Sequence, residues 1–152
     1  MFRKSEEKDC KAIYDLICDM ENKQLPYAIF EACYRKQLQM ENMYCLIDEE
    51  EGKVRGMLNL RFEDQLHHCE KIAEVMEFVV SSFCRDQKVG QQMLAEARRI
   101  ALEKGCSQIE VACNQLREDT HRFYEREGMH NFHYKFSKRL LGDDSGGNVL
   151  GR

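Results

Sequence analysis

The sequence predicts a mixed α/β fold in a single domain. Helical and extended patterns follow one another in the order β-α-α-β-β-β-α-β-α-β, with hairpins before a central crossover. Two apolar runs around an acidic, glycine-containing turn indicate an antiparallel hairpin. A chain of 152 residues can bury one core of ordinary size.

The N-terminal half begins with two helices and continues with strands. Asp9 can cap a helix that runs to about Met20, and a second helix follows Pro26, the only proline. The stretch "MYCLIDEEEGKVRGMLNLRF" predicts two strands joined at Gly52. Residues Ile72–Val80 predict a third strand, alternating at first and then continuously apolar.

The C-terminal half alternates helices and strands. Val89–Lys104 is helical and is stopped by Gly105. A strand with Ile109, Val111 and Cys113 on one face comes next. A short helix covers Arg117–Glu127, and "HNFHYKFSKRL" alternates as a closing strand. These elements predict a domain over residues 1–141, followed by a glycine-rich, mobile tail at 142–152.

Composition excludes several classes of protein. A net charge of −4 and a pI near 5.8 argue against a nucleic-acid binder. No run of about 18 apolar residues spans a membrane, and "MFRKSEEKDC" has no signal-peptide core. The eight cysteines form no CxxC pair, so we expect reduced thiols in a cytoplasmic protein.

The stretch "VVSSFCRDQKVGQQML" joins a strand to a helix through a charged turn. Amides at a helix start lack acceptors and attract anions, and Arg85, Lys88 and Gly90 suit such a site. A solvated surface turn explains the same residues, and both interpretations remain open here. Lys88 is tolerated in an anion loop if its φ is negative; a positive φ there would be costly.

A second motif, "FYEREG", lies downstream on the short helix. Tyr124 can donate its phenolic proton to a leaving group, whereas an aromatic pair such as Phe123–Tyr124 also suits core packing. The two motifs together resemble the Gcn5-related N-acetyltransferase superfamily, whose loop pattern is Gln/Arg-x-x-Gly-x-Gly/Ala. Arg85 and Gly90 fill its outer positions, and Lys88 replaces its first glycine.

The resemblance extends from about Arg3 to Leu141. Within the superfamily, "DLICDME", "LHHCEKIAEVMEFVV" and "HRFYEREGMHNFHYKFSKRL" resemble the bacterial aminoalkylphosphonate N-acetyltransferases. This likeness implies a mostly antiparallel sheet with a V-shaped splay after the fourth strand, and acetyl transfer from acetyl-coenzyme A to a small-molecule primary amine by direct attack in a ternary complex. It also implies a homodimer, because members of this superfamily commonly dimerise.

The resemblance assigns roles to individual residues. Tyr124 would be the general acid, and a carboxylate or a water chain would deprotonate the amine. Glu74 is the first choice as base and Glu77 the second; strand alternation places them on opposite faces. The expected contacts to the cofactor come from Phe78, Val79, Val80, Arg85, Gln87, Lys88, Val89, Gly90, Gln91, Asn114 and Tyr124.

No metal site is predicted. His67 and His68 would point to opposite faces of a strand and therefore cannot easily share an ion. By resemblance, a divalent ion assisting a phosphonate substrate stays open. So do two alternative functions: the same chemistry on a polyamine, aminoglycoside or protein amine, and a coenzyme A sensor without turnover.

Overall fold

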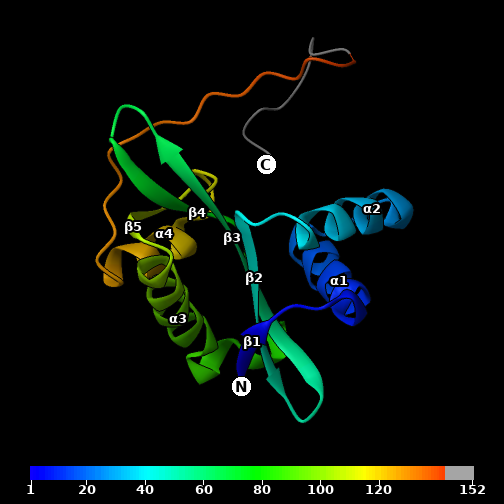
Figure 1. Cartoon of the computed structure of the whole chain (residues 1–152). Helices are drawn as coiled ribbons and strands as arrows, with labels where there is room; N and C mark the ends of the chain where they lie inside the picture. The colour runs from blue at the N-terminus through cyan, green and yellow to red at the C-terminus, as the bar shows by residue number, and fades with distance from the viewer. Residues whose placement is uncertain (143–152) are drawn as a thin grey trace. The chain divides into compact units, whose positions relative to one another are not determined.

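The computed structural model describes residues 1–142, and the side chains of all of these except residues 85–87. The chain divides into two compact units, Met1–Val111 and Ala112–Arg152. The first unit contains β1 (Phe2–Lys4), the short 3-10 helix η1 (Glu7–Asp9), α1 (Cys10–Glu21), α2 (Tyr27–Leu38), β2 (Met43–Glu50), β3 (Lys53–Gln65), β4 (Glu70–Val80), η2 (Ser82–Gln87), α3 (Val89–Glu103) and β5 (Cys106–Val111) (Figure 1).

The five strands form one mixed sheet in the order β1-β2-β3-β4-β5. The first three pairings are antiparallel and the last, β4 with β5, is parallel. Glu51 and Gly52 both have positive φ in the turn between β2 and β3, which is the geometry that closes a two-residue hairpin. The predicted mixed α/β class and the acidic hairpin are therefore confirmed.

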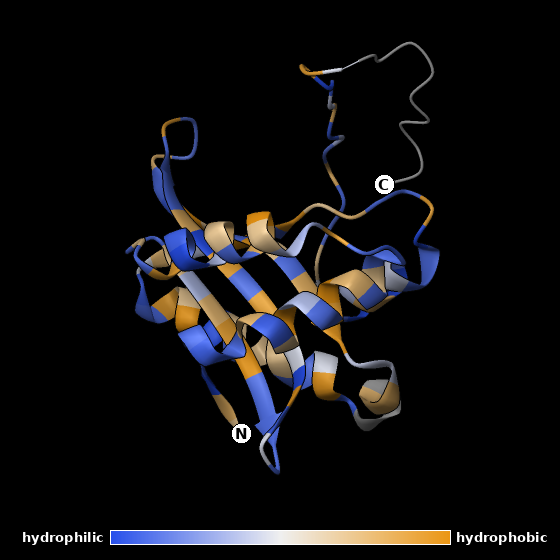
Figure 2. Cartoon of the chain, turned by 90° about the vertical axis from the view of Figure 1, so that its right-hand side faces the viewer, coloured by the Kyte–Doolittle hydropathy of each residue, from blue (hydrophilic) through white to orange (hydrophobic). Residues whose placement is uncertain are grey.

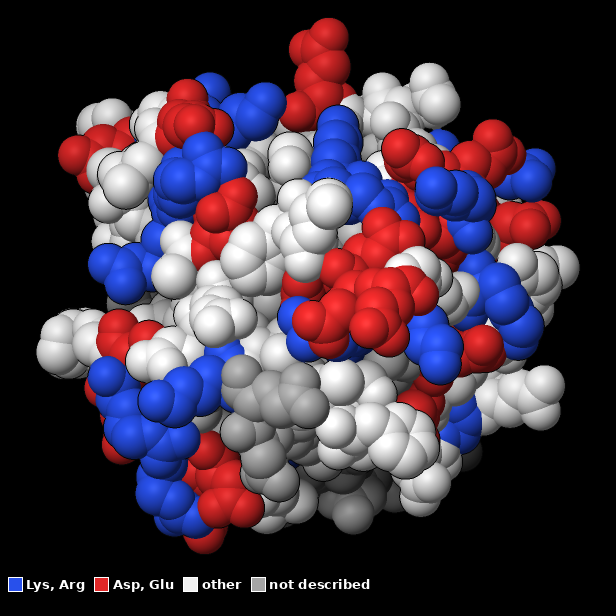
Figure 3. All heavy atoms as spheres, turned by 90° about the horizontal axis from the view of Figure 1, so that it is seen from below, with Lys and Arg blue, Asp and Glu red and all other residues white. Residues whose placement is uncertain are grey.

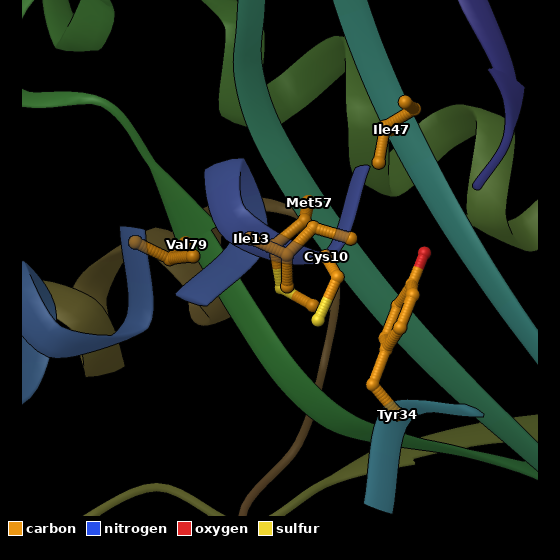
Figure 4. Packing of buried hydrophobic residues seen from close by; sticks show 6 residues of the cluster. All are labelled: Cys10, Ile13, Tyr34, Ile47, Met57 and Val79. Carbon is orange, nitrogen blue, oxygen red and sulfur yellow. The ribbon is translucent and has the colours of Figure 1, made fainter. Parts of the chain in front are cut away.

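Helices α1 and α2 cover one face of the sheet because each presents an apolar stripe to it (Figures 1 and 2). Ile13 of α1 and Tyr34 of α2 pack with Ile47 and Met57 of the strands in a buried cluster (Figure 4). The bounds of α1 agree with the prediction and Asp9 occupies the predicted N-cap position, but its side chain makes no capping hydrogen bond to α1. The Asp9 carboxylate instead accepts hydrogen bonds from the Arg3 guanidinium and the Glu6 amide.

Helix α3 contacts β2, β3, β4 and β5 and packs on the opposite face (Figure 1). Gly56 permits this approach: a Cβ added there would lie 2.7 Å from the Met93 sulfur and 3.2 Å from the Val79 carbonyl oxygen. The sheet is thus covered on both faces, which gives the unit its two apolar layers.

The second unit contains α4 (Glu118–Arg126), which is followed two residues later by the left-handed Gly128 with φ 83°. The predicted closing strand at 130–140 is wrong, since these residues have no strand conformation. The side chains of Phe132, Tyr134 and Phe136 are exposed. Alternation is a local pattern, whereas a strand also needs a partner for its backbone.

The remaining predictions concern membrane spans, surface charge, the cysteines and the C-terminal tail. No helix in the described part of the chain is both long and apolar enough to cross a membrane. Figure 3 shows Lys and Arg side chains interspersed with Asp and Glu on the face that it displays. All eight cysteines are free thiols. The predicted tail lies outside the described residues, apart from Gly142.

Candidate active site

A β-bulge in β4 decides where the two candidate carboxylates point. Asn59 of β3 pairs with Glu77, whereas the next residue, Leu60, pairs with Val75, so Met76 is an extra residue. An extra residue reverses the alternation beyond it, and Glu74 and Glu77 therefore lie on the same face of the sheet. The prediction that they occupy opposite faces is wrong, because it assumed an unbroken period of two.

A cavity of about 290 Å³ lies on this face, between the strands and the α1–α2 pair. Glu77 supplies the single carboxylate among the described residues that line it, and Lys4 supplies the single cation. Most of the remaining wall is apolar. The lining residues are Lys4, Ile13, Ile17, Phe30, Cys33, Tyr34, Gln37, Leu38, Met43, Cys45, Met57, Asn59 and Glu77.

Glu77 is held by an amide network inside this cavity. The Asn59 Nδ2 atom lies 2.9 Å from Glu77 Oε2 and 2.9 Å from Gln37 Oε1. Burial raises the pKa of the Glu77 carboxyl, and the hydrogen bond from Asn59 opposes that rise. Glu77 therefore combines a position in the cavity with a proton affinity shifted toward that of a base working near neutral pH.

Glu74 has a different environment. Its Oε2 atom lies 2.7 Å from Arg61 Nη2, and the same nitrogen lies 3.6 Å from Glu63 Oε1. The charge of Glu74 is therefore offset by a guanidinium within hydrogen-bond distance. Glu74 is also absent from the described lining of the cavity.

The strand-to-helix turn combines a 3-10 helix with one left-handed residue. The Ser81 hydroxyl accepts a hydrogen bond from the Phe83 amide, and η2 follows. Lys88 then adopts φ 59° and ψ 20°, the positive φ identified as costly for a residue other than glycine. The side chains of Arg85 and Gln87 lie outside the described part of the structure.

The first turn of α3 presents donors at this point. The first helical bond after Lys88 runs from the Gln92 amide to the Lys88 carbonyl at 3.1 Å. The amides of Val89, Gly90 and Gln91 come before it, where an α-helix has no acceptor for them. These donors and the helix dipole suit an anion such as a pyrophosphate.

β4 and β5 separate beside this turn. Their parallel register ends at Val75–Val111, whereas β4 continues to pair with β3 as far as Val80. β5 itself ends at Val111, so beyond Val75 no strand in the described part of the chain pairs with this edge of β4, which is where the splay was predicted. The side chain of Val79 packs in the apolar cluster, and Phe78 faces Leu58 of β3.

In the second unit, Tyr124 lies on α4 with its ring 5.3 Å from that of Phe123, in edge-to-face geometry. Burial raises the pKa of Tyr124 to about 12, so its hydroxyl keeps its proton at neutral pH. The Gly128 of the motif has a structural role: the Met129 amide bonds to the Tyr124 carbonyl across the left-handed glycine.

Asn114 makes a local turn ahead of α4. Its Oδ1 atom accepts a hydrogen bond of 2.8 Å from the Leu116 amide, and its carbonyl oxygen lies 2.7 Å from His121 Nε2. Asn114 therefore acts as a turn residue in this structure. Contact with a cofactor remains a prediction.

The predicted placement of the histidines is wrong. His67 and His68 lie in the turn between β3 and β4, and their ring centroids are 4.2 Å apart. The reason is that the hairpin turns at this point, so strand alternation does not apply. Over the residues that the structure describes, no group of three or more His, Cys, Asp or Glu side chains is arranged to hold a metal ion.

Two polar residues of the site were not singled out from the sequence. Asn59 is 5% exposed within the apolar run "GMLNLRF", and a buried polar residue in such a run was an available signal. Gln37 offered none, because a glutamine on an amphipathic helix is ordinary.

The chain is similar to known acetyltransferases over most of its length. The family model of the acetyltransferase (GNAT) family matches residues 11–129. An aminoalkylphosphonate N-acetyltransferase of Salmonella typhimurium is 36% identical over 138 residues, which covers 91% of this chain and 90% of that protein.

Solved structures share the fold at lower identity. A transcriptional regulator from Bacillus halodurans C-125 superposes with a TM-score of 0.85 and 21% identity, covering 92% of this chain and 99% of that one. Glucosamine-6-phosphate N-acetyltransferase from Arabidopsis thaliana gives 0.78 and 21%, covering 93% and 98%.

Proposed function

The chain belongs to the acetyltransferase (GNAT) family, and on this premise we propose that it transfers the acetyl group of acetyl-coenzyme A to the primary amine of an aminoalkylphosphonate-like molecule. The observation that carries the choice of acceptor is the 36% identity to the Salmonella typhimurium enzyme over nine-tenths of both chains. The N-acetyltransferase activity predicted from the sequence is confirmed by the same two comparisons.

The proposed cofactor site combines the turn and the separated strands. The amides of Val89, Gly90 and Gln91 would bind the pyrophosphate, with those of Gln87 and Lys88 beside them. Arg85 would add a positive charge. The main chain of Phe78, Val79 and Val80, together with Asn114, would contact the rest of acetyl-coenzyme A, which supplies the acetyl group as a thioester.

For the reaction, we propose Glu77 as the general base in preference to Glu74. Glu77 lines the cavity without an ion-pair partner among the described residues, whereas Glu74 is paired with Arg61. Glu77 would take the proton from the ammonium form of the acceptor, directly or through a water chain. Tyr124, neutral at working pH, would protonate the departing thiolate.

The cavity supports a small acceptor. A single carboxylate can attract one ammonium group, and a volume of about 290 Å³ suits a compact molecule. A polyamine or an aminoglycoside carries several positive charges and would need a cluster of carboxylates, which the described lining does not contain. Lys4 offers one cation for an acidic group on the acceptor.

Release of free thiol from acetyl-coenzyme A tests this proposal. The panel contains an aminoalkylphosphonate, the aminoalkyl carboxylate and the plain alkylamine of equal chain length, and a polyamine, each with and without a divalent ion. We expect the phosphonate to give the highest kcat/KM. Higher kcat/KM with the polyamine would overturn the choice of acceptor, and cofactor binding without turnover of any amine would indicate a sensor.

Further expectations belong to this proposal. The acetyltransferase domain would span residues 1–141, which is supported by a family match that runs through both compact units. The protein would work in the cytoplasm, and as a homodimer. It would bind neither nucleic acid nor membranes.

A further inference from the structure

We propose that Asn59 and Gln37 are positioning residues that hold the Glu77 carboxylate toward the cavity through a chain of two hydrogen bonds. This inference rests on the proposed function, in which Glu77 is the general base. It adds two residues, on β3 and α2, that act through Glu77 without contacting the reacting atoms.

The direction of the chain follows from the chemistry of its ends. An ionised carboxylate only accepts hydrogen bonds, so Asn59 must present its NH₂ group to Glu77. The same Nδ2 atom lies 2.9 Å from Gln37 Oε1, which can only accept. One amide nitrogen therefore uses both hydrogens, one on each neighbour, and this fixes the orientation of Asn59. Asn59 is 5% exposed and has little room to turn away.

Two titratable side chains that line the cavity with Glu77, Tyr34 and Cys45, carry no charge at neutral pH. Tyr34 of α2 donates its hydroxyl to the Glu6 carbonyl at 2.6 Å, and burial raises its pKa to about 12. Burial also raises the pKa of the Cys45 thiol of β2 to about 12. Both groups are therefore uncharged at neutral pH.

Charged side chains also lie in and beside the cavity that Glu77 lines. Lys4 of β1 lines the same cavity, and the Arg61–Glu74 pair occupies the next position on the same face of β3 and β4. Helix α1 contributes only apolar side chains to the lining. Within the described set of residues, no cation forms a salt bridge with Glu77.

An amide anchor and an ion pair have different consequences for a base. A guanidinium partner, such as Arg61 beside Glu74, offsets the negative charge of the carboxylate. An amide fixes the position of the carboxylate and leaves its negative charge available to attract an ammonium group. The Gln37–Asn59–Glu77 chain thereby separates positioning from neutralisation.

The test is the pH dependence of kcat/KM with one amine substrate in a matched set of variants. Asn59→Leu removes the donor while keeping the number and branching of the side-chain heavy atoms, and we expect the acid limb of the profile to move up by about one pH unit. The value of kcat/KM would therefore fall roughly tenfold on the acid side of the profile and return to that of the wild type at high pH. Gln37→Leu should give a smaller shift in the same direction, and Asn59→Ser, which keeps a donor, a partial return.

Asn42→Leu is the control, since it makes the same change at an exposed position, and its profile should match the wild type. Should Asn59→Leu fail to fold by circular dichroism, Gln37→Leu on the half-buried helix decides. A uniform loss at every pH, or an unmoved acid limb, would overturn the inference. Absence of thiol release by the wild type would instead refute the proposed function.

Discussion

Replacement of Lys88 by glycine should stabilise the protein, because Lys88 has φ 59° and ψ 20°. A left-handed backbone costs a residue with a Cβ about 1–2 kcal/mol, and glycine avoids this cost. Glycine also gives the unfolded chain more conformational entropy, which lowers the stability of the folded protein by about 0.4–1 kcal/mol. The difference predicts that Lys88→Gly increases the free energy of unfolding by about 0.5–1 kcal/mol relative to Lys88→Ala.

The comparison with alanine removes the effect of the lysine charge, and a second pair controls for glycine itself. Lys104 is exposed and has φ −80°, so Lys104→Gly should be less stable than Lys104→Ala by about 0.5–1 kcal/mol. Urea denaturation of all four variants measures both differences, which must have opposite signs. Two differences of equal sign would refute a left-handed Lys88.

The same variants test the proposed role of the turn. If backbone amides bind the pyrophosphate, Lys88→Gly and Lys88→Ala should bind acetyl-coenzyme A with nearly equal Kd, since neither removes a donor. Lys88→Pro should lose binding, because proline is fixed near φ −65° and has no N–H. Equal binding by all three variants would exclude this backbone site.

Three other substitutions address the chemistry and the core. Glu77→Gln should lower kcat/KM by about 10²-fold or more. The Tm of Glu77→Gln should also exceed that of the wild type by an amount that grows as pH rises. Because the pKa of Glu77 is raised in the folded protein, its protonated form favours the fold at low pH, and this contribution is lost when the carboxyl ionises. A Tm difference that does not change with pH would contradict the raised pKa. Tyr124→Phe should lower kcat about 10²-fold with little change in cofactor Kd, whereas the exposed Tyr134→Phe should be neutral; an unchanged kcat removes Tyr124 from the mechanism. Ile47→Ala, at a fully buried position, should cost about 2–5 kcal/mol in urea denaturation, and the exposed Ile29→Ala less than about 0.5; equal costs would place Ile47 outside the core.

The predicted elements were confirmed where the signal was local. The acidic turn at Gly52, the start of α2 after Pro26 and the start of α3 at Val89 all depend on neighbouring residues in the chain. The two motifs that indicated an acetyltransferase are local as well, and the comparisons confirm that activity. The strand predicted at 130–140 failed because the alternation of its side chains does not provide a backbone partner.

Candidate residues show the same division. The sequence identified Glu74 and Glu77 as possible bases but could not show that both lie on the same face of the sheet. The extra residue Met76 reverses the alternation between them, and a bulge exists only in the pairing of two strands. Asn59 gains its contact to Glu77 from the same pairing.

By itself, the sequence determined the fold class, the family and the positions of Tyr124 and the strand-to-helix turn, because these depend on short-range pattern and motif. Only the tertiary structure decided which carboxylate faces the cavity, which amides hold it and that Lys88 is left-handed. Those properties arise from strand register, from helices packed on one face of the sheet and from the path of the turn, none of which is encoded within a few neighbouring residues.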